Sequence, residues 1–182
     1  AVVEQEGWLA ALPDGDRAAI LESVRNHNRL TIPAHVRDRS LAFLHLVRDA
    51  DKLDIFRVVL DALERDGFRD LTAMLPHVTL DRRLSPAFVE HISGRRCASL
   101  GKVNTLADFL LMQAFWAYDL NYPPALKRFH DRGILARILK HLDGDVRIHA
   151  LVSEVQRHVL KRAGKKGGQA TFFATERTGQ KA

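Results

Sequence analysis

Three aspartates stand close together in residues 47–56, a segment that otherwise has the composition of a buried helix: Asp49, Asp51 and Asp54. At about 100° per residue, Asp51 falls in the middle of an apolar helix face. That face comprises Leu44, Val47, Ile55, Val58 and Ala62. An ionised carboxylate on a packed face is costly unless a cation or strong hydrogen-bond donors compensate it. The spacing therefore predicts a cation beside Asp51.

Two kinds of cation could compensate Asp51. A divalent metal ion is one, because carboxylate oxygens are preferred ligands of hard and borderline cations. The guanidinium of an arginine in a structural salt bridge is the other, and the helix spacing alone does not choose between them. Asp49 lies on the opposite side of the same helix, and we expect it to pair with a nearby arginine rather than to bind metal.

His27 is the second candidate for chemistry. Ile20, Val24 and His27 follow one another at spacings of four and three residues and so share one helix face. The imidazole of His27 therefore points toward the core or a cleft in it. The residue before a proline avoids the helical region, so the segment from Asn28 to Pro33 ends this helix. As an alternative, a histidine at a helix end can hydrogen-bond the last carbonyls of its own helix.

The residues 48–54, Arg-Asp-Ala-Asp-Lys-Leu-Asp, resemble the closing metal-ligand motif of the HD superfamily of metal-dependent phosphohydrolases. In that family a helical bundle holds one or two divalent ions through the pattern His … His-Asp … Asp, and the last Asp resembles Asp51. Residues 24–33 resemble the stretch in which a His ends a helix and a Pro follows. Residues 108–110 and 116–121 are similar to the helical extension of a bacterial subgroup, so the resemblance covers about residues 15 to 160.

The resemblance implies a ligand role for Asp51, and for His27 either a second-metal role or a contact with the substrate phosphate. Asp54 lies about one turn beyond Asp51, where it could orient a ligand or a water. Lys52 is the other candidate catalytic residue, although it lies about 100° round the helix from Asp51. Arg29 and Arg48, together with His27, are the candidate phosphate-binding residues.

One part of the family pattern is missing. The first His and the His-Asp pair should precede the His27 segment, yet no histidine occurs between Ala1 and Asn26. The only aspartates there, Asp14 and Asp16, stand at a turn. We therefore expect either the C-terminal portion of a longer HD protein or a member that has lost half of its site. We expect the chain not to complete the metal centre by itself.

The pattern of apolar residues predicts an all-α fold, and the resemblance implies an HD-domain-like helical bundle with a helical C-terminal extension. We expect a long central helix from about Asp38 to Arg65, ended by Gly67, and a helix capped by Asn104 or Thr105 that runs to Asn121. No strand-type alternation is visible. We divide the chain into the HD-type core at 1–75, the helical extension at 76–163 and a disordered basic tail at 164–182.

The amino-acid composition is compatible with several functions and does not select one of them. The 182 residues carry a formal net charge of +6, with 46% hydrophobic and 27% charged residues, which is ordinary for a soluble globular protein. Half of the net charge comes from the tail. The lone Cys97 fits a reducing cytoplasm. No run of about 18 apolar residues is present, so we expect no membrane span.

These observations together predict a metal-dependent phosphohydrolase that acts on a nucleotide or another phosphate ester. The expected cofactor is a divalent ion, and the His and Asp ligands suit Mn, Fe, Ni, Co, Zn and Mg alike. The partner is a phosphorylated small molecule or nucleotide, and a homodimer stays open. The missing ligands favour an alternative, a catalytically inactive HD-scaffold regulatory or interaction module. The basic tail favours a second alternative, a helical nucleic-acid-binding protein, although we do not expect nucleic acid as the partner.

Overall fold

The computed structural model describes residues 2–92 and 99–164. Within them the chain forms nine α-helices and two short 3-10 helices and contains no strand; a single isolated bridge joins Thr79 and Thr105. The elements are α1 (Val2–Gln5), α2 (Asp14–Asn26), α3 (Asp38–Asp66), α4 (Leu71–Met74), α5 (Pro86–Ile92), η1 (Leu100–Lys102), α6 (Leu106–Phe115), η2 (Trp116–Asp119), α7 (Pro123–Asp131), α8 (Ile134–Leu139) and α9 (Val146–Ala163).

The predicted all-α class is confirmed, whereas the HD-domain-like arrangement stays a prediction. The predicted disordered tail at 164–182 lies, apart from Gly164, outside the described residues. In the described part of the chain, no helix is long and apolar enough to cross a membrane.

The long helix α3 joins the two groups of helices, because it packs against α2 and against α7 and α8. It has 29 residues and ends one residue beyond the predicted limit. Gly67 stops it in the left-handed conformation, with φ of 73°. The N–H of Gly67 donates to the carbonyl of Leu63 at 2.9 Å, and the N–H of Phe68 donates to the carbonyl of Ala62 at 3.2 Å. The bond from Gly67 to Leu63 is that of an αL C-cap, for which glycine is preferred because it has no Cβ.

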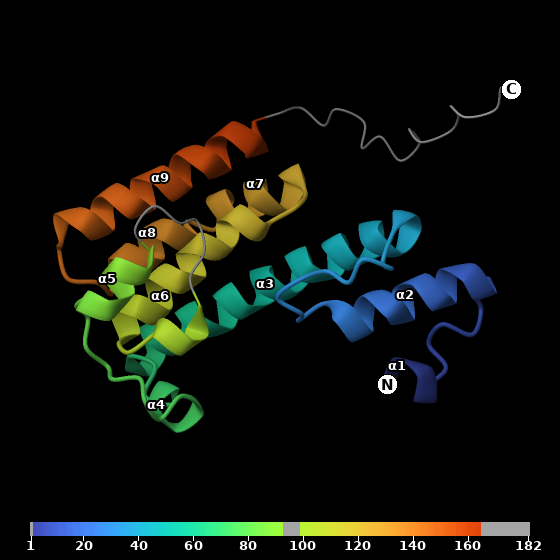
Figure 1. Ribbon diagram of the computed structural model, residues 1–182, viewed down its shortest axis with the longest axis horizontal. Coiled ribbons are helices and arrows are strands. Elements are labelled where there is room, and N and C mark those ends of the chain that lie inside the picture. The colour runs from blue at the N-terminus through green and yellow to red at the C-terminus, as the bar shows by residue number, and fades with distance from the viewer. Residues whose placement is uncertain (1, 93–98, 165–182) are drawn as a thin grey trace, which may run out of the picture.

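Helix α6 is the centre of the larger lobe. All ten of its residues are buried, because the C-terminal half of α3 and helices α5, α7, α8 and α9 surround it (Figure 1). Phe56 of α3 meets Phe129 of α7 edge to face, with ring centroids 5.0 Å apart. A helix that is hydrophobic all round requires such a position. The chain turns out of α6 at Phe115, six residues earlier than predicted, into the 3-10 helix η2.

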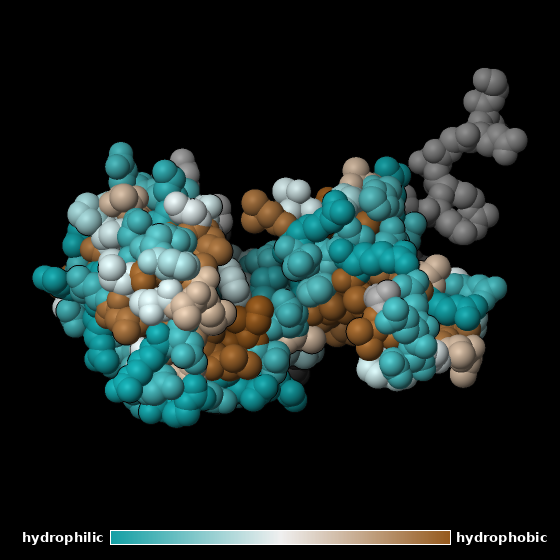
Figure 2. Space-filling model, turned by 90° about the horizontal axis from the view of Figure 1, so that it is seen from below, coloured by the Kyte–Doolittle hydropathy of each residue, from teal (hydrophilic) through white to brown (hydrophobic). Residues whose placement is uncertain are grey.

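Helix α2 pairs with the N-terminal half of α3 and forms the smaller lobe (Figure 1). The two helices run in the same direction, and residues 27–37 carry the chain back between them. An ion pair joins Arg39 to Asp16, and the hydroxyl of Ser23 donates to the carbonyl of Ser40 at 3.1 Å. Hydrophobic surface is visible on both lobes from below (Figure 2).

The apolar face predicted for α3 is only partly buried. Leu44 is fully buried beside α2, but Val58, on the same predicted face, is 51% exposed. Leu46, on another side of α3, is also 55% exposed. The physical reason is the length of α2, which covers only the first half of this face. The bundle packs on a different face of α3, the one that carries Phe56 and Leu60.

The predicted cap of α6 is confirmed at Thr105, whose hydroxyl accepts from the N–H of Asp108 at 3.1 Å. The fully buried carboxylate of Asp108 completes a capping box and also accepts from the N–H and hydroxyl of Ser85, at 2.9 and 2.6 Å. The N–H of Asn104 donates to it as well, at 3.0 Å. One carboxylate therefore fixes the start of α6 and the start of α5.

We expect Asp108→Asn to lower the free energy of unfolding by about 2–4 kcal/mol, because the new amide N–H₂ would face donors that then lose their acceptor. Urea unfolding at pH 7 measures the change. Asp131→Asn is the control: among the described residues its exposed carboxylate accepts from Lys127 alone, at 2.6 Å, so the change should stay within about 0.5 kcal/mol. Equal losses in both variants would contradict a special role for Asp108.

Candidate functional site

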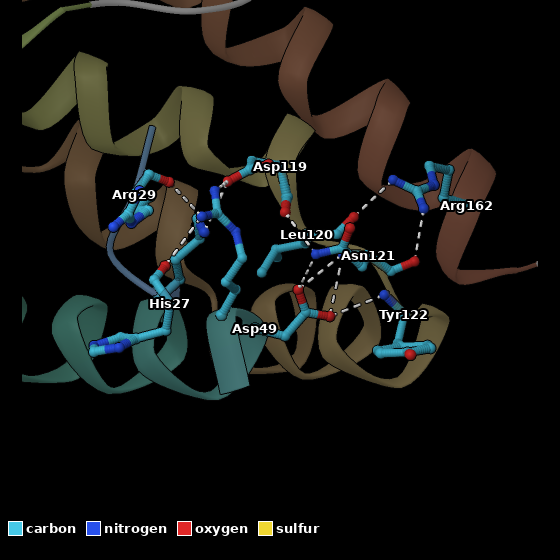
Figure 3. Close-up of polar contacts among 10 residues, drawn as sticks. His27, Arg29, Asp49, Asp119, Leu120, Asn121, Tyr122 and Arg162 are labelled. Atoms are coloured by element: carbon cyan, nitrogen blue, oxygen red, sulfur yellow. Dashed lines mark hydrogen bonds and ion pairs between the residues drawn. The ribbon is translucent and has the colours of Figure 1, made fainter. Parts of the chain in front are cut away.

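The polar residues of α3 meet the chain of η2 in one cluster, drawn in Figure 3. Asp119 is the last residue of η2, and a single oxygen of it, Oδ2, accepts from Arg48 Nη2 at 2.8 Å and lies 2.8 Å from Lys52 Nζ. Arg48 and Lys52 are only 7% and 8% exposed, whereas the side chain of Asp119 is 49% exposed. Two buried cations of α3 therefore share one partly solvated carboxylate.

Burial alone would raise the pKa of Asp119. The hydrogen bonds and positive charges of Lys52 and Arg48 outweigh that effect and hold the pKa of this carboxyl below its usual range. Nearby on α3, burial lowers the pKa of His45, an effect that Asp49 and Asp119 oppose and Arg48 reinforces. His45 is therefore neutral at pH 7 and leaves the charge of the cluster to the other residues.

The neighbouring carboxylate of Asp49 binds amide groups and not the two cations. It accepts from the backbone N–H and the side-chain amide of Asn121, both at 2.9 Å, and from the N–H of Tyr122 at 2.9 Å. The prediction that Asp49 pairs with an arginine is therefore wrong. Its partners are the amides that precede α7, and Figure 3 shows Asp49 pointing at them.

From the other side, Arg162 of α9 donates to the carbonyls of Leu120 and Asn121, at 2.7 and 2.8 Å. The segment between η2 and α7 is thus held by side chains of two helices.

His27 is the C-cap of α2, and its ring is half-buried. Its Nδ1 lies 2.7 Å from the carbonyl oxygen of Val24. A carbonyl can only accept, so Nδ1 carries the proton and the lone pair of a neutral ring is on Nε2. This tautomer agrees with the alternative of a helix-end histidine, and it is also the tautomer of most metal-bound histidines. Figure 3 shows the ring pointing away from Asp119.

The backbone of His27 faces the cluster instead. Arg48 Nη1 donates to the carbonyl of His27 at 3.0 Å and to the carbonyl of Arg29 at 2.6 Å. Arg48 precedes Asp51 by three residues on α3, so the end of α2 lies within about one helical turn of Asp51 along the helix axis. The fold therefore brings the His27 segment to the level of Asp51.

Asp51 itself is half-buried, and no described residue gives it a hydrogen bond or an ion pair. Asp54, in contrast, is exposed, and its carboxylate accepts a hydrogen bond from Arg57 Nη2 at 2.8 Å. Lys52 points to Asp119 and not to the side of Asp51. The structure thus separates the catalytic candidates Lys52 and Asp54 from each other, on different faces of α3.

The candidate phosphate-binding residues are also separated. The side chain of Arg29 is exposed, and that of Arg48 is buried with its contacts directed to two carbonyls and Asp119. Phosphate binding by either residue stays a prediction, as does the division of the chain at residue 75.

The donor chemistry at Asp51 and His27 fits a divalent ion, since both an uncompensated carboxylate and an imidazole Nε2 are suitable ligands. In the part of the chain that the structure describes, however, no group of three or more His, Cys, Asp or Glu side chains could hold a metal ion. The described residues supply at most part of a ligand set.

Comparisons of the chain with protein-family models, with curated proteins and with solved structures find no match.

Sequence reasoning found Asp119 but missed Asn121, Tyr122 and Arg162 as parts of the polar cluster. The signal for Asn121 and Tyr122 was Asp49 itself, because a buried carboxylate needs donors and the backbone before a Pro-Pro helix start has free N–H groups. Nothing in the spacing indicates Arg162, which reaches the same segment across 41 residues of the chain.

We expect Asp119→Asn to lower the free energy of unfolding by about 1–2 kcal/mol at pH 7, since Lys52 and Arg48 lose a charged acceptor that is partly screened by water. The folded-state pKa of Asp119 is lowered, so its stabilising effect is complete above the unfolded value of about 3.9 and is lost as the pH falls through the folded value. Urea unfolding at pH 7, 5, 4 and 3 should show the gap between wild type and variant close at the acid end. A gap that does not depend on pH would contradict this account.

Proposed function

We propose that this chain contributes Asp51 and His27 to the metal centre of an HD-type metal-dependent phosphohydrolase, with a phosphate ester or nucleotide as substrate. The remaining ligands would come from outside the described residues. The observation that carries the proposal is Asp51, a half-buried carboxylate on a partly apolar face of α3 to which no described residue offers a donor.

Uncompensated carboxylates in such surroundings are costly, which is the reason to assign a cation to this one. The neighbouring aspartates serve as an internal comparison. Asp49 has three close donors and Asp54 has Arg57, so Asp51 differs from both neighbouring aspartates of α3. His27 supports the same assignment, because the bond from Nδ1 to Val24 leaves Nε2 as the free ligand atom.

When a divalent ion is bound, such a site supplies an activated water and polarisation of a phosphoryl oxygen. The chain's own residues would act on the protein side: the Val24 carbonyl holds the His27 tautomer, and the exposed Arg29 is free to meet a phosphate beside it. Arg48 and Lys52, engaged with Asp119, would keep the end of α2 and η2 in place.

Selective broadening of backbone amide NMR signals by Mn²⁺ tests the metal assignment on the 182-residue chain. We expect broadening centred on residues 27–30 and 50–55, because a paramagnetic ion relaxes the nuclei nearest to it. Asp51→Asn should abolish the effect, whereas Asp54→Asn, the matched change one turn away, should leave it. Broadening that survives Asp51→Asn, or none at these residues, would overturn the assignment.

A second function, a non-catalytic interaction module, is favoured by a separate observation: helix α3 exposes the apolar side chains of Leu46 and Val58, at 55% and 51%. Adenosine monophosphate distinguishes the two. If the proposal holds, its ³¹P relaxation rises with Mn²⁺ and wild-type chain above the rate with Mn²⁺ and the Asp51→Asn variant. Metal binding without this difference would favour the interaction module.

A further inference from the structure

The turn that follows α2 is weakly held by its own backbone. Between residues 27 and 33, the N–H of Arg29 donates to the carbonyl of Asn26 at 3.2 Å, and burial contributes little, because Arg29 and Thr31 are exposed and Leu30 is 95% exposed. A turn of this kind needs another constraint if it is to present a side chain in one place.

Arg48 supplies that constraint from outside the turn. One guanidinium nitrogen, Nη1, donates to the carbonyls of both His27 and Arg29, at 3.0 and 2.6 Å. The planar guanidinium presents its donors in a fixed fork, so two carbonyls bound to it are fixed relative to each other as well as to α3. The buried position of Arg48, at 7% exposure, leaves the side chain little freedom to move.

Arg48 is in turn fixed from the far side of the cluster. Its other nitrogen, Nη2, donates to Asp119 at 2.8 Å, and Lys52 lies at the same distance from the same oxygen. A chain of polar contacts therefore runs from η2 through α3 to the backbone of His27. No comparable contact links Asp49 to the turn, since its partners are Asn121 and Tyr122.

We infer that Arg48 is a positioning residue for His27, with Asp119 as its anchor, and not a phosphate ligand. The inference rests on the proposed function, because it concerns the place of the His27 ring relative to Asp51. Arg48 fixes the backbone of His27 while the Val24 carbonyl fixes its ring, so the two contacts together set where Nε2 lies.

Arg48→Lys tests the inference, because lysine keeps the charge but has one nitrogen and cannot bind the two carbonyls and Asp119 from separate nitrogens as Arg48 does. We expect Mn²⁺ affinity, measured by the amide-broadening titration, to fall by about tenfold, as is typical when a supporting contact of a ligand is lost. We also expect the amide of Arg29 to exchange its hydrogen faster, while amides of the buried helix α6 keep their rates relative to the control variant. Asp119→Asn, a milder change that retains Arg48, should move both readouts in the same direction by less.

Asp49→Asn is the matched control, since it alters the adjacent buried residue of α3 and weakens contacts to Asn121 and Tyr122 without touching the turn. It should lower stability but leave the Mn²⁺ affinity and the exchange of the Arg29 amide unchanged. Equal effects of Asp49→Asn and Arg48→Lys on both readouts would overturn the inference, because the turn would then respond to stability alone.

The two proposals fail separately. If wild type shows no broadening that depends on Asp51, the metal assignment fails, while faster exchange of the Arg29 amide in Arg48→Lys still supports the clamp on the turn. If the broadening is present but Arg48→Lys changes neither readout, the metal assignment stands and the positioning role of Arg48 fails.

Discussion

The carboxylate of Asp119 is the point on which the arrangement of the two lobes depends. It is the shared acceptor of Arg48 and Lys52, two cations that α3 buries at 7% and 8% exposure. Burying a cation without a partner costs far more than a buried pair gains, so this acceptor stabilises the packing of α3. Since Arg48 also holds the end of α2, Asp119 of the larger lobe is linked through Arg48 to the smaller one.

The helices were largely predictable because their boundaries are set locally. Gly67, Thr105 and the prolines at the start of α7 each act within one turn, through the left-handed conformation, side-chain capping or a preset φ. The end of α6 was not predictable in the same way. Residues 116–119 continue the apolar periodicity, but the chain tightens there into η2, which brings Asp119 to face α3.

For the face of α3 that carries Asp51, the periodicity of apolar residues did not predict which part of the face is buried. Helix α3 has apolar residues on more than one side. Its own sequence does not indicate which neighbouring helix buries each side, or how many turns of that side are buried. Leu44 is buried and Val58 is not, although both belong to one stripe, because α2 ends between their levels. The same limit applies to Asp49, whose donors lie 72 and 73 residues away.

The parallel course of α2 and α3 bears on the order in which the chain assembles. Arg48 meets His27 across 21 residues but meets Asp119 across 71, so the clamp on the turn after α2 is complete only once η2 has docked. Contacts between distant parts of a chain form late, because loop-closure entropy must be overcome first. During synthesis α2 and α3 therefore leave the ribosome before η2, and the turn after α2 lacks its full set of contacts until η2 has been made.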